Sequence, residues 1–456
     1  MEPTWQPPTA RDLLALAWPM ILGRAAQSVV GFTDAVLVAP LGPDALAATG
    51  NGALNELAVF MLPVGVAFIV QSFAAQLSAR GDAVRLRRYG WYGLGIAFLA
   101  QVVGVALVPA VPWLLARADY TPAVRALMGD YMALRLLGVG AAVGIEAIAN
   151  WFGGQGNTRV GLAASVLVMA LNVPLAWLLI HGGFGVPAMG VRGAAIASIL
   201  ATAAGFTYAL ATFLRAGRDL PRPTWRWSEF RRVLRFGLPN GVNWFLEFAS
   251  FLFFIDVVFA RMGTTALAAL MAVLQLNSIA FMPAFGLANA GAIHVGQALG
   301  AGRADAVRAL VRRTMLAAAG WMLLVGTGYA LTPRLLLAPF SPGSVAARTG
   351  FLAVGVPLLW VAVAWQLFDA ATIVLGETLR AAGDTAWPMR VRIAISWGAF
   401  VPITLLTARW GGGPVAALSW VVAYMAALAA LLARRFAGGA WRTVSLTGDE
   451  AGVVVD

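Results

Sequence analysis

The sequence has 456 residues, of which 60% are hydrophobic and only 11% are charged. Soluble domains carry about a quarter of their residues as charged side chains, so the composition excludes a water-soluble globular protein and indicates one embedded in a membrane. Cysteine is absent and all 32 basic residues are arginine, which excludes disulfides, a Walker A lysine and a Schiff-base lysine. We therefore expect no bound cofactor, and any uphill work would draw on an ion gradient.

Apolar runs between Arg, Gly and Pro breaks predict about twelve membrane-spanning helices, because one span needs about 20 mostly apolar residues. The first six are expected near residues 13–39, 53–79, 90–115, 125–150, 160–181 and 191–215. The second six are expected near residues 233–260, 270–299, 310–337, 349–376, 388–408 and 414–436. The predicted fold class is thus an all-α membrane protein.

These helices group into two lobes of six. We expect an N-terminal lobe over residues 11–215 and a C-terminal lobe over residues 233–436. The charged, proline-broken segment 216–232 between them is predicted to be a cytoplasmic linker. Residues 437–456 form a polar cytoplasmic tail, in which we expect no packed structure.

The formal net charge of +12 has a topological explanation. Most arginines lie at the two ends and in the loops after even-numbered helices, so the positive-inside rule places both termini in the cytoplasm. We expect a multi-pass protein of the bacterial inner membrane. The lipid bilayer, rather than nucleic acid, accounts for the basic residues.

The two halves repeat one another. The pattern FxDxV occurs at Phe32–Val36 and again at Phe254–Val258, and DAVR occurs at Asp82–Arg85 and Asp305–Arg308. Matches in the same order at a nearly constant offset indicate an internal duplication. An even number of helices per repeat gives both halves the same orientation, as in transporters whose substrate site lies between the repeats near the membrane midplane. The repeat therefore favours a transporter.

Several acidic residues fall inside the predicted spans, where a charged side chain costs about 2.5–3.5 kcal/mol on insertion scales. Those well inside are Asp34, Glu146, Glu247, Asp256 and Asp369. Those expected nearer helix ends, where snorkelling or capping suffices, are Glu56, Asp130 and Glu377.

Such carboxylates have two interpretations. Burial disfavours the charged form, so a buried carboxylate can bind a proton or a sodium ion that competes with a cationic substrate, which is the chemistry of an antiporter. Alternatively, each carboxylate is a structural partner of Arg24 or Arg135, the two arginines within predicted helices. Glu247 and Asp256 lie about 180° apart on a regular helix, so they share one cavity only if the helix breaks.

Motifs in both halves together resemble the multidrug and toxic compound extrusion (MATE) family, and its NorM-type branch most. WPMILGRAAQSVVGFTDAV is similar to the family's helix-1 pattern, with Gln27 and Asp34 at its Gln and Asp. GLPNGVNWFLEF places Glu247 on the helix-7 glutamate, and FDAATIVLGETLRAAGDT places Asp369 on the helix-10 aspartate, one turn after Gln366. The resemblance covers roughly residues 11–436.

Two further motifs support the same resemblance in the first half. LNVPLAW and GVRGAAIAS match family segments at Asn172 and Ser198. The sequence departs from the family pattern at Ala176, where the family has Asn or Asp, and at Asp256, which is an additional acid. Loss of an oxygen at position 176 shifts our expectation toward protons, since sodium needs several oxygen ligands and a proton needs one carboxylate.

The resemblance implies a V-shaped, two-lobed, monomeric transporter that exports cationic amphipathic drugs in exchange for H⁺ or Na⁺. It places coupling and substrate binding at Asp34, Glu247 and Asp369, with support from Gln27, Asn172 and Ser198. From their positions inside the spans, Asp256 and Gln366 are further possible supporting residues. No resident metal is expected, although Na⁺ could bind transiently at Glu247 and Asp369.

Two alternatives remain at this point. A flippase for lipid-linked sugars or other lipids would use arginines in the cavity to hold pyrophosphate, and Arg24 and Arg135 are the only candidates. An intramembrane enzyme would need a Ser/His, His/Asn or paired-Asp constellation. The chain has only two histidines, His181 and His294, both near helix ends, so we expect no enzyme.

Overall fold

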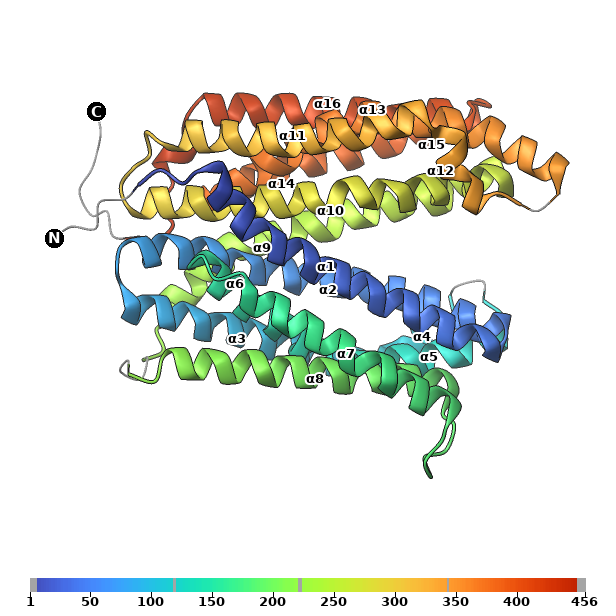
Figure 1. Cartoon of the computed structure of the whole chain (residues 1–456), viewed down its shortest axis with the longest axis horizontal. Helices are drawn as coiled ribbons and strands as arrows, with labels where there is room; N and C mark the ends of the chain where they lie inside the picture. The colour runs from blue at the N-terminus through green and yellow to red at the C-terminus, as the bar shows by residue number, and fades with distance from the viewer. Residues whose placement is uncertain (1–5, 118–119, 220–223, 343, 449–456) are drawn as a thin grey trace. The chain divides into compact units, whose positions relative to one another are not determined.

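The computed structural model describes residues 6–117, 120–219, 224–342 and 344–448. These residues form α-helices with short 3₁₀ and π segments and no β-strand, apart from one isolated bridge between Gly183 and Val186 (Figure 1). Eleven helices in this part of the chain are long and apolar enough to cross a membrane. The number rises to twelve if one pair bent by 47° counts as a single span. The predicted all-α membrane fold is confirmed.

The elements of the first half follow the predicted order. They are α1 (Ala10–Val38), η1 (Ala39–Leu41), α2 (Pro43–Ala79), α3 (Ala83–Leu107), η2 (Val108–Ala110), α4 (Val111–Leu115), α5 (Pro122–Leu136), α6 (Val139–Gly154), α7 (Arg159–His181) and α8 (Gly190–Ala216). The bent pair consists of α5 and α6.

The second half has the same order, with two additional π segments. Its elements are α9 (Trp227–Phe253), η3 (Phe254–Phe259), η4 (Ala260–Met262), α10 (Thr264–Gly300), α11 (Val307–Leu331), α12 (Pro333–Leu337), η5 (Ala338–Phe340), α13 (Val345–Ala382), α14 (Ala386–Ile395), η6 (Ser396–Phe400), α15 (Val401–Arg409), α16 (Pro414–Ala437) and η7 (Ala440–Thr443).

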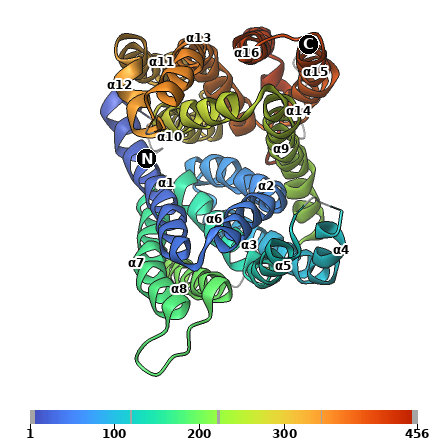
Figure 2. The ribbon, with the colours of Figure 1, turned by 90° about the vertical axis from the view of Figure 1, so that its right-hand side faces the viewer.

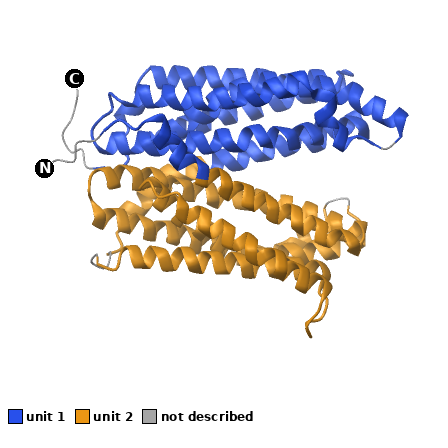
Figure 3. Cartoon of the chain, viewed as in Figure 1, with its two compact units in different colours: residues 1–18, 242–456 blue, residues 19–241 orange. Residues whose placement is uncertain are grey.

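Contacts divide the chain into two compact units (Figure 3). Unit 1 contains residues Met1–Trp18 and Val242–Asp456, and unit 2 contains residues Pro19–Gly241. Each boundary falls inside a helix, within α1 and within α9, and each lies next to or near a helix-interior proline, Pro19 or Pro239. In α1, the residues up to Trp18 belong to unit 1 and the rest to unit 2. In α9, the residues up to Gly241 belong to unit 2 and the rest to unit 1.

Unit 2 is a helical bundle in which α2 packs against α3, α5 and α6, while α7 and α8 run side by side (Figure 2). Small residues permit this close packing, as is common in membranes, where lipid provides no hydrophobic drive between helices. At Gly193 in α8, an added methyl group would collide with the main chain of Leu179 in α7. Close backbone contact therefore fixes the pair that carries Asn172 and Ser198.

The segment predicted as a linker is partly helical. Its residues 220–223 lie outside the described residues, but α9 begins at Trp227, six residues before the expected start. Glu229 in its first turn is buried and accepts hydrogen bonds from Arg88 in α3 at 2.8 Å and from the Tyr92 hydroxyl at 3.0 Å. This ion pair holds the start of α9 against α3 within unit 2.

Unit 1 is built around α10 and α13, with α11 and α16 packed against them. The π segments η3 and η6 lie close together, since the rings of Phe254 and Phe400 are 5.3 Å apart. The Trp397 indole in η6 donates a hydrogen bond to the Leu246 carbonyl in α9 at 3.2 Å. These contacts hold the α9–η3 and α14–η6 helices together in unit 1.

The tail does not behave as expected from its polar composition. Trp441 in η7 is 2% exposed and stacks on Phe436, and Leu446 is 1% exposed against Gly383 at the end of α13. The expectation of an unpacked tail is therefore wrong for residues 440–447. Two apolar side chains in an otherwise polar segment are enough to dock it. The last residues of the predicted tail, 449–456, lie outside the described residues.

Candidate ion and substrate sites

Three side chains from three helices of unit 2 meet at one place. Asp34 lies on α1, Asn172 on α7 and Ser198 on α8. The Ser198 hydroxyl donates to Asp34 Oδ2 at 3.3 Å, and the Asn172 amide nitrogen donates to Ser198 Oγ at 3.1 Å. The structure thus brings together three of the residues identified from the sequence, which we call the Asp34 cluster.

Two oxygens of the Asp34 cluster have no donor. Asp34 Oδ1 and Asn172 Oδ1 are both buried and accept no hydrogen bond from the described residues. A buried acceptor left unsatisfied costs about 1–3 kcal/mol. No ion pair to Asp34 occurs within this part of the chain either, so the cluster has capacity for a proton, a cation or a water molecule.

The departure from the family pattern at Ala176 falls next to this cluster. Ala176 is fully buried and lies one helical turn after Asn172, hence on the same face of α7. A carboxylate or amide there would add an oxygen close to Asn172. Alanine removes it, which leaves the cluster with few oxygen ligands for a metal cation.

Unit 1 holds a second arrangement, in which only one carboxylate is free of an ion pair. Glu247 on α9 is ion-paired with Arg392 on α14. Asp369 on α13 is 5% exposed, is in electrostatic contact with both members of that pair, and accepts a hydrogen bond from Thr372 Oγ1 at 3.4 Å. We call Glu247, Asp369 and Arg392 the Asp369 cluster. Its formal charge is −1 when Asp369 is ionised and zero when it is protonated.

Three of the supporting residues named from the sequence lie elsewhere. Gln366 is buried and donates to Asn277 Oδ1 at 3.0 Å, and no hydrogen bond joins it to Asp369. Asp256 lies on η3 with an exposed side chain, and no ion pair or hydrogen bond reaches it within the described residues. Gln27 contacts Arg24 and Glu146 instead of Asp34.

Comparison with known proteins identifies the family. The MatE family model matches residues 19–178 and 241–406, more than half of the chain. The chain belongs to the MatE family. This confirms the resemblance drawn from the motifs and identifies the chain as a NorM-type transporter and not an enzyme.

Individual relatives agree with this assignment. A probable multidrug resistance protein NorM of Chromobacterium violaceum is 30% identical over 414 residues, covering 87% of this chain and 86% of its own. One from Mesorhizobium japonicum is 30% identical and covers 93% of both chains. The crystal structure of the eukaryotic MATE transporter AtDTX14 matches with a TM-score of 0.83 at 18% identity, over 95% of this chain and 96% of that one, which supports the fold.

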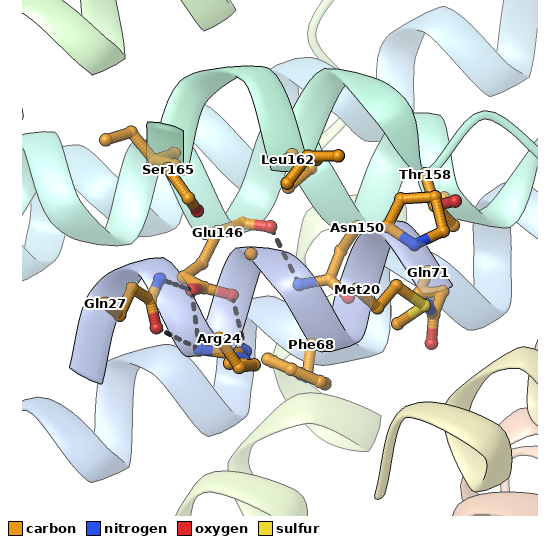
Figure 4. A pocket seen from close by; sticks show the side chains of 16 residues that line it. Met20, Arg24, Gln27, Phe68, Gln71, Glu146, Asn150, Thr158, Leu162 and Ser165 are labelled. Carbon is orange, nitrogen blue, oxygen red and sulfur yellow. Dashed lines mark hydrogen bonds and ion pairs between the residues drawn. The ribbon is translucent and has the colours of Figure 1, made fainter. Parts of the chain in front are cut away.

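Arginines within this MatE protein neutralise two of the membrane carboxylates. Arg24 pairs with Glu146 at 3.0 Å, as the structural interpretation of Glu146 supposed (Figure 4). Arg135 pairs with Glu56 at 2.7 Å. The expected position of Glu56 near a helix end is wrong. α2 begins at Pro43, ten residues before the predicted start, so Glu56 lies well inside the helix, and the Glu56 side chain is buried. Arg24 and Arg135 are therefore paired with Glu146 and Glu56. They are not paired with the coupling candidates Asp34, Glu247 and Asp369.

Sequence reasoning missed Arg392 in this MatE chain. It lies within the predicted span 388–408, but no motif singles it out; it is the seventh residue of α14, and its side chain is only 13% exposed. An arginine that deep in an apolar segment is itself a signal for a carboxylate partner. Glu377 is likewise not an end-capping residue, since it is buried in an ion pair with Arg380. No group of three or more potential metal ligands occurs in the described residues.

Proposed function

We propose that this MatE protein is a secondary active multidrug efflux transporter that exchanges cationic amphipathic compounds for protons by alternating access. The observation that carries the proposal is a carboxylate in each unit that has no ion-pair partner among the described residues, Asp34 in unit 2 and Asp369 in unit 1. The relatives named as multidrug resistance proteins support efflux of drugs.

A carboxylate of this kind serves two ligands in turn. When protonated it is neutral and tolerates its apolar surroundings, and when ionised it attracts a cation, because an unpaired charge away from water is costly. An organic cation and a proton therefore exclude one another at the same group. Release of one on binding the other links the two fluxes without a covalent step.

The ligand sets favour the proton over sodium. At Glu247, Arg392 already occupies the place that a sodium ion would take, and the Arg392 side chain is only 13% exposed. In the Asp34 cluster, Ala176 supplies no oxygen beside Asn172. A proton needs only one carboxylate oxygen, and Asp34 Oδ1 is available for it.

We further propose that the chain works as a monomer in the bacterial inner membrane with both termini in the cytoplasm. The distribution of arginines supports this orientation through the positive-inside rule. Flipping of a pyrophosphate lipid is less well supported, because Arg24, Arg135 and Arg392 each hold a carboxylate and present no free cation for phosphate.

The test is ethidium efflux from liposomes that contain the purified chain, driven separately by a pH gradient and by a sodium gradient. We expect the pH gradient alone to drive efflux. We expect Asp34→Asn and Asp369→Asn each to reduce it at least about tenfold, equivalent to about 1.4 kcal/mol of lost coupling. Asp130→Asn is the matched control, because Asp130 is paired with Arg192 at an exposed position and such pairs contribute little.

Three results would contradict the proposal at different points. Efflux driven by sodium would make the proton assignment wrong. Efflux that responds to neither gradient would remove ion coupling altogether. Full pH-driven efflux in both Asp→Asn variants would show that the sites are wrong even though the transporter class is right.

A further inference from the structure

The connection between α7 and α8 is a short hairpin, residues 182–189, which we call the α7–α8 hairpin. Gly183 and Val186 exchange two backbone hydrogen bonds. The Gly183 nitrogen donates to the Val186 oxygen at 3.0 Å, and the Val186 nitrogen donates to the Gly183 oxygen at 2.9 Å. The two-residue turn between them consists of Phe184 and Gly185, with φ angles of +52° and +84°. Positive φ at both central residues is characteristic of a type I′ turn.

Phe184 is an unusual residue for this turn. Type I′ turns favour Asn, Asp or Gly at that position, whereas a bulky side chain at positive φ is strained. Phe184 is the one non-glycine residue with positive φ among the described residues, and it is 95% exposed. Contacts within the described chain therefore do not offset the strain. Residues in such conformations cluster at functional sites, so the position indicates a partner outside the chain.

The hairpin lies at the level of a membrane surface. α7 has 23 residues and is apolar enough to span a membrane. Its length of about 34 Å exceeds the hydrocarbon thickness of about 30 Å by only a few ångströms. The hairpin stays close to the last turn of α7, because the Gly182 nitrogen donates to the Leu178 carbonyl at 2.8 Å and the Met189 nitrogen donates to the Leu179 carbonyl at 2.9 Å. It therefore begins in the headgroup region.

The hairpin also points sideways. It runs across the ends of α7 and α8 and extends beyond them, away from the other helices of unit 2 (Figure 1, Figure 2). Both helices carry exposed apolar side chains, such as Trp177 on α7 and Leu200 on α8, each 49% exposed. Lipid tails are as apolar as such side chains and can cover them. The tip of the hairpin therefore lies over the lipid beside α7 and α8.

The composition of the hairpin suits lipid better than water. Residues 182–191 read GGFGVPAMGV and contain no polar or charged side chain. Arg192, the first charged residue after them, is paired with Asp130 at 2.9 Å. Phenylalanine is among the apolar residues that bury at the boundary between headgroups and acyl chains. An uncharged segment with an aromatic tip therefore matches the glycerol and upper acyl region of a phospholipid leaflet.

We propose that the α7–α8 hairpin is a membrane anchor whose tip, Phe184, inserts into the phospholipid leaflet beside α7 and α8. Removal of the ring from water offsets the strain of the turn. The anchor holds the ends of α7 and α8 at a fixed depth, and these two helices carry Asn172 and Ser198. The proposal does not depend on which ion or drug the chain transports.

The first test uses the absence of native cysteine. A nitroxide on Ala188→Cys, an exposed position of the hairpin, reports collisions with oxygen, which dissolves in lipid, and with Ni-EDDA, which stays in water. In phosphatidylcholine nanodiscs we expect oxygen collisions to dominate. Asp44→Cys is the control, because Asp44 is an exposed acid in the first turn of α2. It lies at the same end of unit 2, since Leu41 is 3.6 Å from a methyl group built on Gly190. Ni-EDDA collisions should dominate at position 44.

Two substitutions at the tip separate lipid insertion from turn formation. Phe184→Asn favours the turn but removes the ring, and we expect the Ni-EDDA collision rate at position 188 to rise at least about threefold. Phe184→Trp keeps an aromatic residue of the kind enriched at membrane interfaces, and the rate should stay unchanged. An unchanged rate in Phe184→Asn, or Ni-EDDA dominance at position 188 with Phe184 present, would overturn the proposal.

The second test identifies what the ring contacts in a bacterial membrane. The photoreactive analogue p-benzoylphenylalanine replaces Phe184, and irradiation joins it to its neighbour. We expect the intact mass of the chain to increase by that of one phospholipid. The same analogue in place of Trp177, which is 49% exposed on α7, is the positive control. A protein adduct at position 184 would assign the hairpin to a protein partner. A lipid adduct at position 177 without one at position 184 would place the tip in water, and either result overturns the proposal.

Discussion

Glu247 and Arg392 determine the charge balance of the Asp369 cluster. Their pair interacts electrostatically with Asp369 and leaves that carboxylate as the single uncompensated charge of the cluster. We propose that Glu247 holds Arg392 near Asp369 and does not itself bind the transported ion. The family motifs alone do not distinguish Glu247 from Asp369, whereas this assignment gives them different roles.

Single and double substitutions of this pair should differ in how much stability they cost. Glu247→Gln removes the carboxylate that is ion-paired with Arg392, and we expect a loss of about 3 kcal/mol, the low end for buried pairs, because Glu247 is 35% exposed. The double variant Glu247→Gln, Arg392→Gln removes both charges and should recover most of that loss. Thermal unfolding in detergent measures both. Equal destabilisation of the single and double variants would show that the pair has no mutual role.

The residues of the Asp34 cluster were predictable, whereas the partner of Glu247 was not. Asp34, Asn172 and Ser198 each lie in a motif, so the resemblance identified them one by one. Arg392 has no such motif, and its pairing depends on how α9 and α14 lie next to each other in unit 1. The same reason accounts for Gln27 and Gln366, which contact Glu146 on α6 and Asn277 on α10.

At the scale of elements, the α7–α8 pair positions two of the three residues of the Asp34 cluster. Gly193 in α8 allows the contact, because its missing side chain leaves space for the main chain of Leu179. This gives a physical reason for glycine within the segment GVRGAAIAS. Asn172 and Ser198 meet only while the two helices remain this close.

Adding a methyl group at this contact should therefore disturb the cluster. We expect Gly193→Ala to lower stability by about 1–3 kcal/mol, as overpacking generally does, and to reduce pH-driven efflux. Gly50→Ala is the control, because nothing lies within 4 Å of the added group in α2, and alanine favours a helix by about 1 kcal/mol over glycine. Thermal unfolding of both variants provides the comparison, and a Gly193→Ala protein as stable as the control would contradict the packing argument.

Helix order and most helix ends could be read from hydropathy, but the π segments could not. In η3 the wide turns break the regular spacing on which the 180° relation between Glu247 and Asp256 was based. π segments are rare and are frequently found at functional sites. η3 and η6 lie at contacts between helices distant in sequence, such as that of Trp397 with Leu246. Hydropathy along the sequence does not predict contacts between distant helices.

At the scale of the whole molecule, the two repeated halves also share one feature of their buried charges. Each unit presents one carboxylate that is at least half-buried and has no ion-pair partner in the described residues, Asp34 in one and Asp369 in the other, while the other buried acids discussed above are held by arginines. Under the proposed exchange, each unit therefore has one group that can take up a proton, although their surrounding residues differ.

Two such groups make transport sensitive to voltage. If both carry a proton inward for each monovalent drug that leaves, one net positive charge enters per cycle, and an interior-negative potential of 100 mV adds about 2.3 kcal/mol to the driving force. Valinomycin-clamped liposomes should then export a monovalent dye faster at −100 mV than at 0 mV, and a divalent dye at the same rate. Equal rates for the monovalent dye would mean that only one of the two carboxylates is loaded in each turnover. Because the second carboxylate sets this stoichiometry, Asp34→Asn or Asp369→Asn should remove the electrical response from whatever transport remains.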